Sequence, residues 1–450
     1  MKKNFYHFLM LPLLLMAIAG FTSCSEGDAE ESQKKQTVLN EDESKEELEE
    51  IASQLSAEFV ASDFENILDL VEYISQECEK YNVEEQEEWF FEILDGFKQL
   101  KEHNGQYPTY EFIYRLSAFK GKFVANEDSL RLERTESDNL SLHIKDQNGN
   151  PCEVVITTSG KTKTVFCTEE TDYNYNYGWD EYGNWWSNET IEDVEKYYLE
   201  VPEKVTAVLR QNGTKLAELV INTDLSSMAG EKFNLHKDKY SANATAYFNG
   251  YTLNVENLYY ENKKEAKVAF SFKHGNKTLI SASASATPEI NVTDFDEDWN
   301  EEDINSKNNI ATINILDKLL IKGTCNNLGE LIEALDEEWN EETDSKVNKY
   351  FNIEVFFNNS SNASAKIELE SVKDEYYNYQ YIYNPNTGNY EEQYICITDY
   401  DLMPVIVFND GSRNNVEDFF NEDDFANTLE VFESLYDDFE ELLREYDFDF

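Results

Sequence analysis

The sequence predicts an α+β fold, with antiparallel meandering β-sheet in the middle of the chain, an N-terminal helical segment and a long C-terminal amphipathic helix. Three observations predict it: apolar residues at helical spacing in residues 44–97, hairpin-turn dipeptides between alternating segments in residues 110–408, and a second helical stripe from residue 425. Because a helix stripe and a sheet face each need an apolar partner, we expect the helices to pack on the sheet.

The N-terminal helical segment is expected over residues 44–105. Ser44 with Glu47, and Ser62 with Glu65, have the spacing of capping boxes and so predict two helix starts. The apolar stripes that follow are Leu48, Ile51, Leu55 and Phe59, then Phe64, Ile67, Leu68, Val71, Ile74 and Cys78, then Trp89, Phe90, Ile93, Leu94 and Phe97. Such stripes are most simply core contacts.

A β-rich domain with hairpins is expected over residues 106–290, followed by an α+β domain over residues 291–450. Asn-Gly tolerates the positive φ angles of tight hairpins, and it occurs at 148–149, 212–213 and 249–250, while Gly275-Asn276 predicts a fourth turn. Between Ile280 and Ala286, Ile and Ala alternate with Ser. That alternation predicts a strand with small residues on both faces.

The long C-terminal helix is predicted by one apolar stripe, which consists of Phe425, Leu429, Phe432, Tyr436, Phe439, Leu443 and Tyr446. Asp and Glu fill most of the opposite face. A helix this acidic is a poor ligand for anionic membranes, so we expect it to pack across the sheet.

The N-terminus has the features of an exported lipoprotein. Lys2 and Lys3 precede an apolar run, residues 8–21, that is too short to span a membrane comfortably. The run leads into Phe21-Thr22-Ser23-Cys24, which resembles a lipobox. We therefore expect residues 1–23 to be a signal peptide and Cys24 to carry the lipid; the alternative is an ordinary signal peptide with a chance cysteine.

Residues 24–43 are polar and acidic, which predicts an extended tether. Its first residues, 25–31, resemble the acidic export signal of surface lipoproteins in Bacteroidota. The expected address is the outer membrane, exposed at the cell surface, with a periplasm-facing protein as the alternative.

The charge balance excludes nucleic acid as a partner. The chain has 37 Lys and Arg against 92 Asp and Glu, a net charge of −55. Such a field repels nucleic acid and anionic lipid headgroups, so the lipid on Cys24 is the only membrane contact we expect. Hydrophobic residues make up 40% of the chain and aromatic residues 14%, too many for a disordered protein.

The best candidate for a binding site is aromatic. One crowded stretch consists of Tyr173, Tyr175, Tyr177, Trp179, Tyr182, Trp185 and Trp186, interleaved with Asn and Asp. A second consists of Tyr376, Tyr377, Tyr379, Tyr381, Tyr383 and Tyr390. Rings beside amides and carboxylates suit carbohydrate, because sugar C–H faces stack on the rings while the hydroxyls form hydrogen bonds. The alternative is that the rings are cross-strand pairs that only hold strands together.

Metal and catalytic motifs are weak. Asp294, Asp296 and Asp298 have the spacing of a calcium loop, but Trp299 stands where the loop needs glycine and Asn305 where it needs glutamate. No metal, cofactor or catalytic residue is therefore predicted, and an enzyme is not the first expectation. The segment 296–302 recurs at 336–342, for which duplication and chance are both open.

The cysteines suggest a disulfide. If Ser159-Gly160 turned a hairpin, Cys152 would stand directly opposite Cys167. Such a pair has Cα atoms about 5.5 Å apart, a separation that a disulfide can bridge. Merely facing thiols are the alternative.

Several segments of the body resemble those of uncharacterised lipoproteins of Bacteroidales. They are residues 201–205 (VPEKV), 211–214 (QNGT), 223–228 (TDLSSM), 321–325 (IKGTC), 404–408 (PVIVF) and 410–412 (DGS). The resemblance supports the lipoprotein address and implies no activity. We expect a non-enzymatic binding or structural role with glycan as the first ligand class. The alternatives are a carrier of a hydrophobic ligand in a sheet-helix cleft and, third, a hydrolase.

Overall fold

The structure is a computed structural model. It describes residues 38–60, 62–80, 98–100, 109–115, 120–126, 131–179, 182, 185–228, 230, 238–290, 304–336, 339–385, 388–420, 424–431 and 433–434. Over these residues the chain is mostly β-strand with short helices, so the predicted α+β class is wrong. The chain divides into two compact units. Unit 1 comprises Met1–Val60, Asn262–Val292 and Asp296–Glu440, and unit 2 comprises Ala61–Glu261, Thr293–Phe295 and Glu441–Phe450. Residues 44–105, expected to form one helical segment, are therefore divided between the two units.

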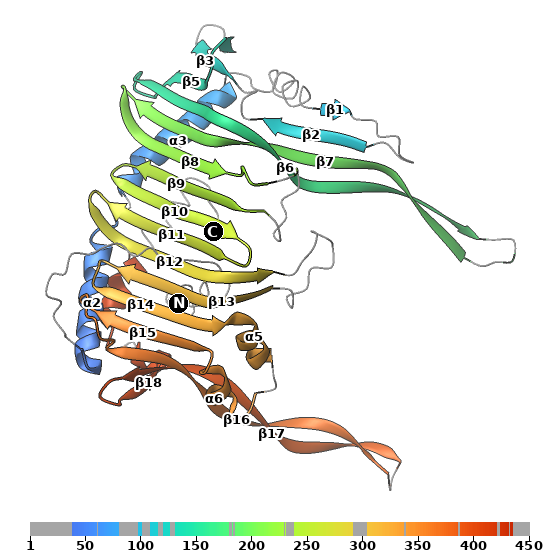
Figure 1. Cartoon of the computed structure of the whole chain (residues 1–450), viewed down its shortest axis with the longest axis vertical. Helices are drawn as coiled ribbons and strands as arrows, with labels where there is room; N and C mark the ends of the chain where they lie inside the picture. Colours follow the sequence, from blue (N-terminus) through green and yellow to red (C-terminus); the bar gives the residue numbers. More distant parts are fainter. Residues whose placement is uncertain are drawn as a thin grey trace. The chain divides into compact units, whose positions relative to one another are not determined.

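Unit 1 is a meandering antiparallel sheet (Figure 1). Its elements are α2 (Glu41–Ser56), β11 (Glu265–His274), β12 (Lys277–Ile290), β13 (Ile304–Ile315), β14 (Leu319–Asn327), α5 (Leu328–Asp336), α6 (Thr343–Val347), β15 (Phe351–Phe357), β16 (Ala365–Asn384), β17 (Asn389–Phe408), β18 (Arg413–Asn415) and α7 (Val416–Phe419). Each strand from β11 to β18 pairs antiparallel with the next one along the chain.

The register of unit 1 sorts apolar and polar residues onto different faces. One row across five strands is apolar and consists of Phe270, Ala282, Ile313, Ile321 and Val355. The adjacent row on the other face includes Ser283 and Thr312, whose hydroxyls are 2.7 Å apart. The alternation predicted between Ile280 and Ala286 is thus confirmed.

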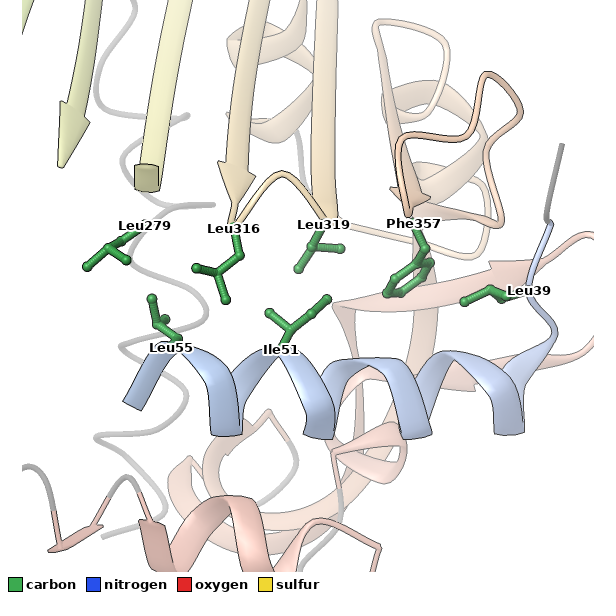
Figure 2. Close-up of a cluster of buried hydrophobic side chains, with 7 residues drawn as sticks. All are labelled: Leu39, Ile51, Leu55, Leu279, Leu316, Leu319 and Phe357. Atoms are coloured by element: carbon green, nitrogen blue, oxygen red, sulfur yellow. The ribbon is translucent and has the colours of Figure 1, made fainter. Parts of the chain in front are cut away.

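Helix α2 packs across the ends of the strands rather than on a sheet face. Figure 2 shows Ile51 and Leu55 pointing at Leu279, Leu316 and Leu319, which lie at hairpin ends. Phe357, at the end of β15, and Leu39, just before the helix, complete this cluster. One helical turn rises about 5.4 Å and strands are about 4.8 Å apart, so successive turns of the helix can meet successive strand ends.

The cap of α2 differs from the predicted one. Asn40 is the N-cap, and it forms a capping box with Glu43 in which each side chain accepts a 3.0 Å hydrogen bond from the other residue's backbone N–H. Ser44 instead lies inside the helix and is buried. The helix therefore begins about one turn before the start that Ser44 and Glu47 predicted.

Over the described residues, unit 2 is a mixed sheet with the helix α3. Its elements are α3 (Ser62–Lys80), β1 (Lys98–Leu100), β2 (Thr109–Arg115), β3 (Gly121–Asn126), β4 (Arg131–Thr135), β5 (Leu140–Lys145), β6 (Pro151–Trp179), β7 (Trp185–Gln211), β8 (Thr214–Asp224), β9 (Tyr240–Phe248) and β10 (Tyr251–Glu261). Strands β5 to β10 pair antiparallel in chain order. Strand β3 pairs parallel with β5 and antiparallel with β4, and β2 pairs parallel with β7.

The predicted hairpin turns are confirmed. The three Asn-Gly pairs join β5 to β6, β7 to β8 and β9 to β10, and Gly275-Asn276 joins β11 to β12. At Asn212 and Gly213 the φ angles are 52° and 78°, and at Asn249 and Gly250 they are 41° and 93°. Both pairs thus have the two positive φ angles of a type I′ turn.

Helix α3 also packs across strand ends. Its Leu70 is buried against Ile144, Cys152 and Leu209, which lie near the turns of β5, β6 and β7. Six residues earlier in the helix, the ring of Phe64 stacks on Tyr251 with a centroid separation of 5.0 Å. Each unit therefore seals the hairpin ends of its sheet with one amphipathic helix.

The predicted long C-terminal helix is wrong. After α7, the described residues hold only a short helical stretch, which comprises residues 426–431 and 433–434. Phe425 and Leu429 pack on a cluster with Phe408 and Phe419, so the start of the predicted stripe does face the sheet. The later stripe residues lie outside the described part of the chain. The carrier hypothesis depended on that long helix and loses its support.

Candidate functional site

Two pairs of strands run on past their neighbours as two-stranded ribbons (Figure 1). In unit 2, β2 pairs with β7 only from Val194 onwards, while β6 and β7 continue to pair as far as Trp179 and Trp185. We call residues 171–193 the first arm. In unit 1, β16 and β17 stay paired far beyond the short ladders with β15 and β18. We call residues 372–401 the second arm.

The first arm carries a row of rings on one face. Strand alternation puts Tyr173, Tyr175, Tyr177 and Trp179 on this face, with Trp185 directly opposite Trp179. The Trp185 ring lies 5.6 Å from Tyr177 in a stacked geometry and 5.3 Å from Trp179 edge to face. The rings of this row are 45% to 68% exposed, and Tyr182 in the turn is 82% exposed. Trp186 pairs with Gly178 in the ladder.

The second arm repeats this arrangement. Tyr377, Tyr379, Tyr381 and Tyr383 share one face of β16, and Tyr390 and Tyr394 join them from β17. The Tyr394 ring stacks on Tyr377 at 5.3 Å, and it approaches Tyr379 at 4.7 Å. These rings are 52% to 70% exposed. Sequence reasoning missed Tyr394, although hairpin pairing from the Asn384 to Asn389 turn would have placed it opposite Tyr379.

Carboxylates lie within both ring rows. The Tyr175 hydroxyl donates to Glu189 Oε1 at 3.4 Å, and the Tyr381 hydroxyl donates to Glu392. The negative charge of Glu189 raises the pKa of Tyr175, and the hydrogen bond to Glu392 raises the pKa of Tyr381. The phenols therefore remain protonated donors at neutral pH, and the carboxylates keep free acceptor sites.

The arms are acidic. The first arm holds Asp172, Asp180, Glu181, Glu189, Glu192 and Asp193 and no Lys or Arg. The second arm holds Asp374, Glu375, Glu391, Glu392, Asp399 and Asp401 and one basic residue, Lys373, which is paired with Glu375. Partial burial raises the pKa of Asp193, and the charge of Asp172 across the ladder raises it further.

The predicted disulfide between Cys152 and Cys167 is wrong. Ser159 and Gly160 do not turn a hairpin but lie inside β6, which is a single strand of 29 residues, and both thiols are free. The ladder is shifted between Ser159 and Thr162, so these residues form an irregularity instead of a reversal. Cys152 stands opposite Gln211. Fifteen extended residues separate the two cysteines by about 50 Å.

The remaining candidate residues lie outside the described part of the chain. They are Cys24 and the weak calcium candidates Asp294, Asp296 and Asp298. Among the residues that the structure describes, no group of three or more His, Cys, Asp or Glu side chains is placed to hold a metal ion. The described helices include none that is long and apolar enough to cross a membrane.

Comparison with known proteins adds no functional assignment. No protein-family model matches the chain, and searches of curated proteins and of solved structures give no match.

Proposed function

We propose that this chain is a lipoprotein of the outer membrane, displayed at the cell surface, that binds polysaccharide through its two arms. The observation that carries the proposal is the row of exposed rings on one face of each arm. Tyr and Trp rings stack on the apolar faces of sugars, and carboxylates between the rings accept hydrogen bonds from sugar hydroxyls.

The exposure of the rings favours binding over a purely structural role. Groups of large exposed apolar side chains are uncommon on soluble proteins and often mark interaction sites. Cross-strand pairing accounts for Tyr379 with Tyr394, but Tyr175 and Tyr381 stand opposite Glu189 and Glu392 instead of another ring. Ladder stabilisation alone does not require rings at those two positions.

The proposed address rests on the N-terminal sequence and on charge. The lipobox-like segment ending at Cys24 would attach the protein to the membrane, and the acidic residues that follow would hold the body away from it. A net charge of −55 keeps a displayed protein soluble and away from anionic lipid headgroups.

The first experiment replaces Trp179 and Trp185 with Ala together and measures affinity for soluble polysaccharides by gel affinity electrophoresis. Dextran, xylan, mannan, hydroxyethyl cellulose and chitosan serve as probes. Loss of two stacked rings should weaken binding of the recognised polysaccharide about ten-fold or more. The thermal midpoint should stay nearly unchanged, because both rings lie outside the buried clusters.

Trp339→Ala is the matched control, since Trp339 is 39% exposed and lies outside both arms. It should leave binding unchanged. Unaltered affinity in the double arm variant would contradict the proposal. So would a large loss of stability, because truncation of a core Trp costs about 3 to 5 kcal/mol.

A further inference from the structure

The carboxylates of the arms are part of the ring rows. Along β17 the alternation places Glu392 on the same face as Tyr390 and Tyr394, directly opposite Tyr381. Along β7, Glu189 shares a face with Trp185 and stands opposite Tyr175. A ligand that stacks on these rings therefore comes within reach of a negative charge in both arms.

The sequences of the two arms contain a single basic residue. The first arm has six acidic residues and no Lys or Arg, and the only basic residue of the second arm, Lys373, is paired with Glu375. A carboxylated or sulfated sugar would meet repulsion within one Debye length, about 8 Å at physiological ionic strength. A protonated amine would meet both an aromatic face and a carboxylate, and both interactions are attractive.

We propose that the arms select glycans that carry protonated amino groups, such as polymers of glucosamine, over neutral and anionic glycans. This selection rests on the proposed glycan-binding function and specifies its substrate class. Ring stacking supplies affinity for the sugar, and Glu189 and Glu392 distinguish the amine from its acetylated form.

The test compares two hexamers that share a backbone, hexaglucosamine and hexa-N-acetylglucosamine, by titration calorimetry at mildly acidic pH. A cation near a ring and an ion pair at an exposed site together should favour hexaglucosamine about ten-fold. The preference should shrink at about 1 M salt, where the Debye length falls to about 3 Å. Hexagalacturonate, which is anionic, should bind more weakly than either.

Glu189→Gln combined with Glu392→Gln should remove the preference for hexaglucosamine, because the amide carries no negative charge to pair with the protonated amine. Glu333→Gln is the control, because Glu333 is an exposed acid on α5 and belongs to neither arm. It should preserve the preference.

Several results would overturn the selection. One is equal or tighter binding of the acetylated hexamer, and another is binding of a neutral polysaccharide without binding of hexaglucosamine. In both cases the proposed function would stand. Hexalysine bound as tightly as hexaglucosamine would assign the arms to basic peptides instead. Failure of every glycan to bind would remove the proposed function itself.

Discussion

Asp193 stands opposite Asp172 where the first arm leaves the sheet. Like charges directly opposite each other destabilise a ladder. The raised pKa of Asp193 reports the same strain, since partial burial and the neighbouring carboxylate both disfavour its charged form. The Asp172–Asp193 pair therefore destabilises the ladder at the base of the first arm.

Asp193→Asn should therefore stabilise the ladder of the first arm at neutral pH and slow its amide hydrogen exchange. Because the folded pKa of Asp193 lies above its unfolded value, its contribution to stability is fully present below the unfolded pKa and is lost as pH rises through the folded pKa. The gain in stability that Asp193→Asn gives should appear at pH 7 and vanish in acid, below the unfolded pKa of Asp193. Hydrogen exchange of the amides in residues 171–193, compared at equal pH, measures it. Asp138→Asn, an exposed acid of the same unit outside the arm, should give no gain. Equal gains at both pH values would contradict the electrostatic explanation.

The two amphipathic helices α2 and α3 pack apolar residues against the strand ends of their units. In unit 1, Ile51 is 3% exposed and lies in the cluster with Leu279, Leu316 and Leu319. The backbone N–H of Leu39 also donates to the buried Ser364 hydroxyl at 3.0 Å, which ties the start of the helix to the β15–β16 connection. We infer that α2 stabilises the sheet of unit 1 as a core helix would.

Ile51→Ala should lower the free energy of unfolding of unit 1 by about 2 to 5 kcal/mol, because it leaves a cavity between the helix and the strand ends. Denaturant unfolding measures the change. Glu46→Ala, at an exposed position of the same helix, should change stability by less than about 0.5 kcal/mol. Similar losses in the two variants would show that the helix contributes little through its buried face.

At the scale of the whole molecule, the proposed lipid on Cys24 and the acidic residues that follow it would attach the body to a membrane and hold it away from the lipid surface. The net charge of −55 disfavours contact with anionic headgroups. Attachment would then depend on the lipid alone.

Cys24→Ser should abolish fatty-acid labelling of the exported protein, because the thiol is the proposed acylation site. Metabolic labelling followed by gel fluorography measures it. Cys167→Ser, which removes an exposed thiol of the body, should leave the labelling unchanged. Retained labelling in Cys24→Ser would contradict the lipoprotein proposal.

Local chemistry determined part of the fold directly. The turn at Asn212-Gly213 could be predicted because its φ angles are those that Asn and Gly tolerate best. The faces of β12 and the rows of Tyr in both arms follow from the two-residue period of a strand. These features depend on neighbours in the sequence, so the sequence by itself determined them.

Other features depend on partners that are distant in the sequence. Ser159-Gly160 resembles a turn, yet β6 runs through it because β7 pairs along both sides of the irregularity. Leu316 and Asp317 do turn a hairpin at φ angles of 54° and 56°. Asp tolerates such an angle but Leu rarely adopts it, and the packing of Leu316 against α2 offsets that strain. An apolar stripe shows that a helix needs a partner, but not whether the partner is a sheet face or a row of strand ends. Only the tertiary structure decided these points, because long-range pairing and burial outweigh local preferences of about 1 kcal/mol per residue.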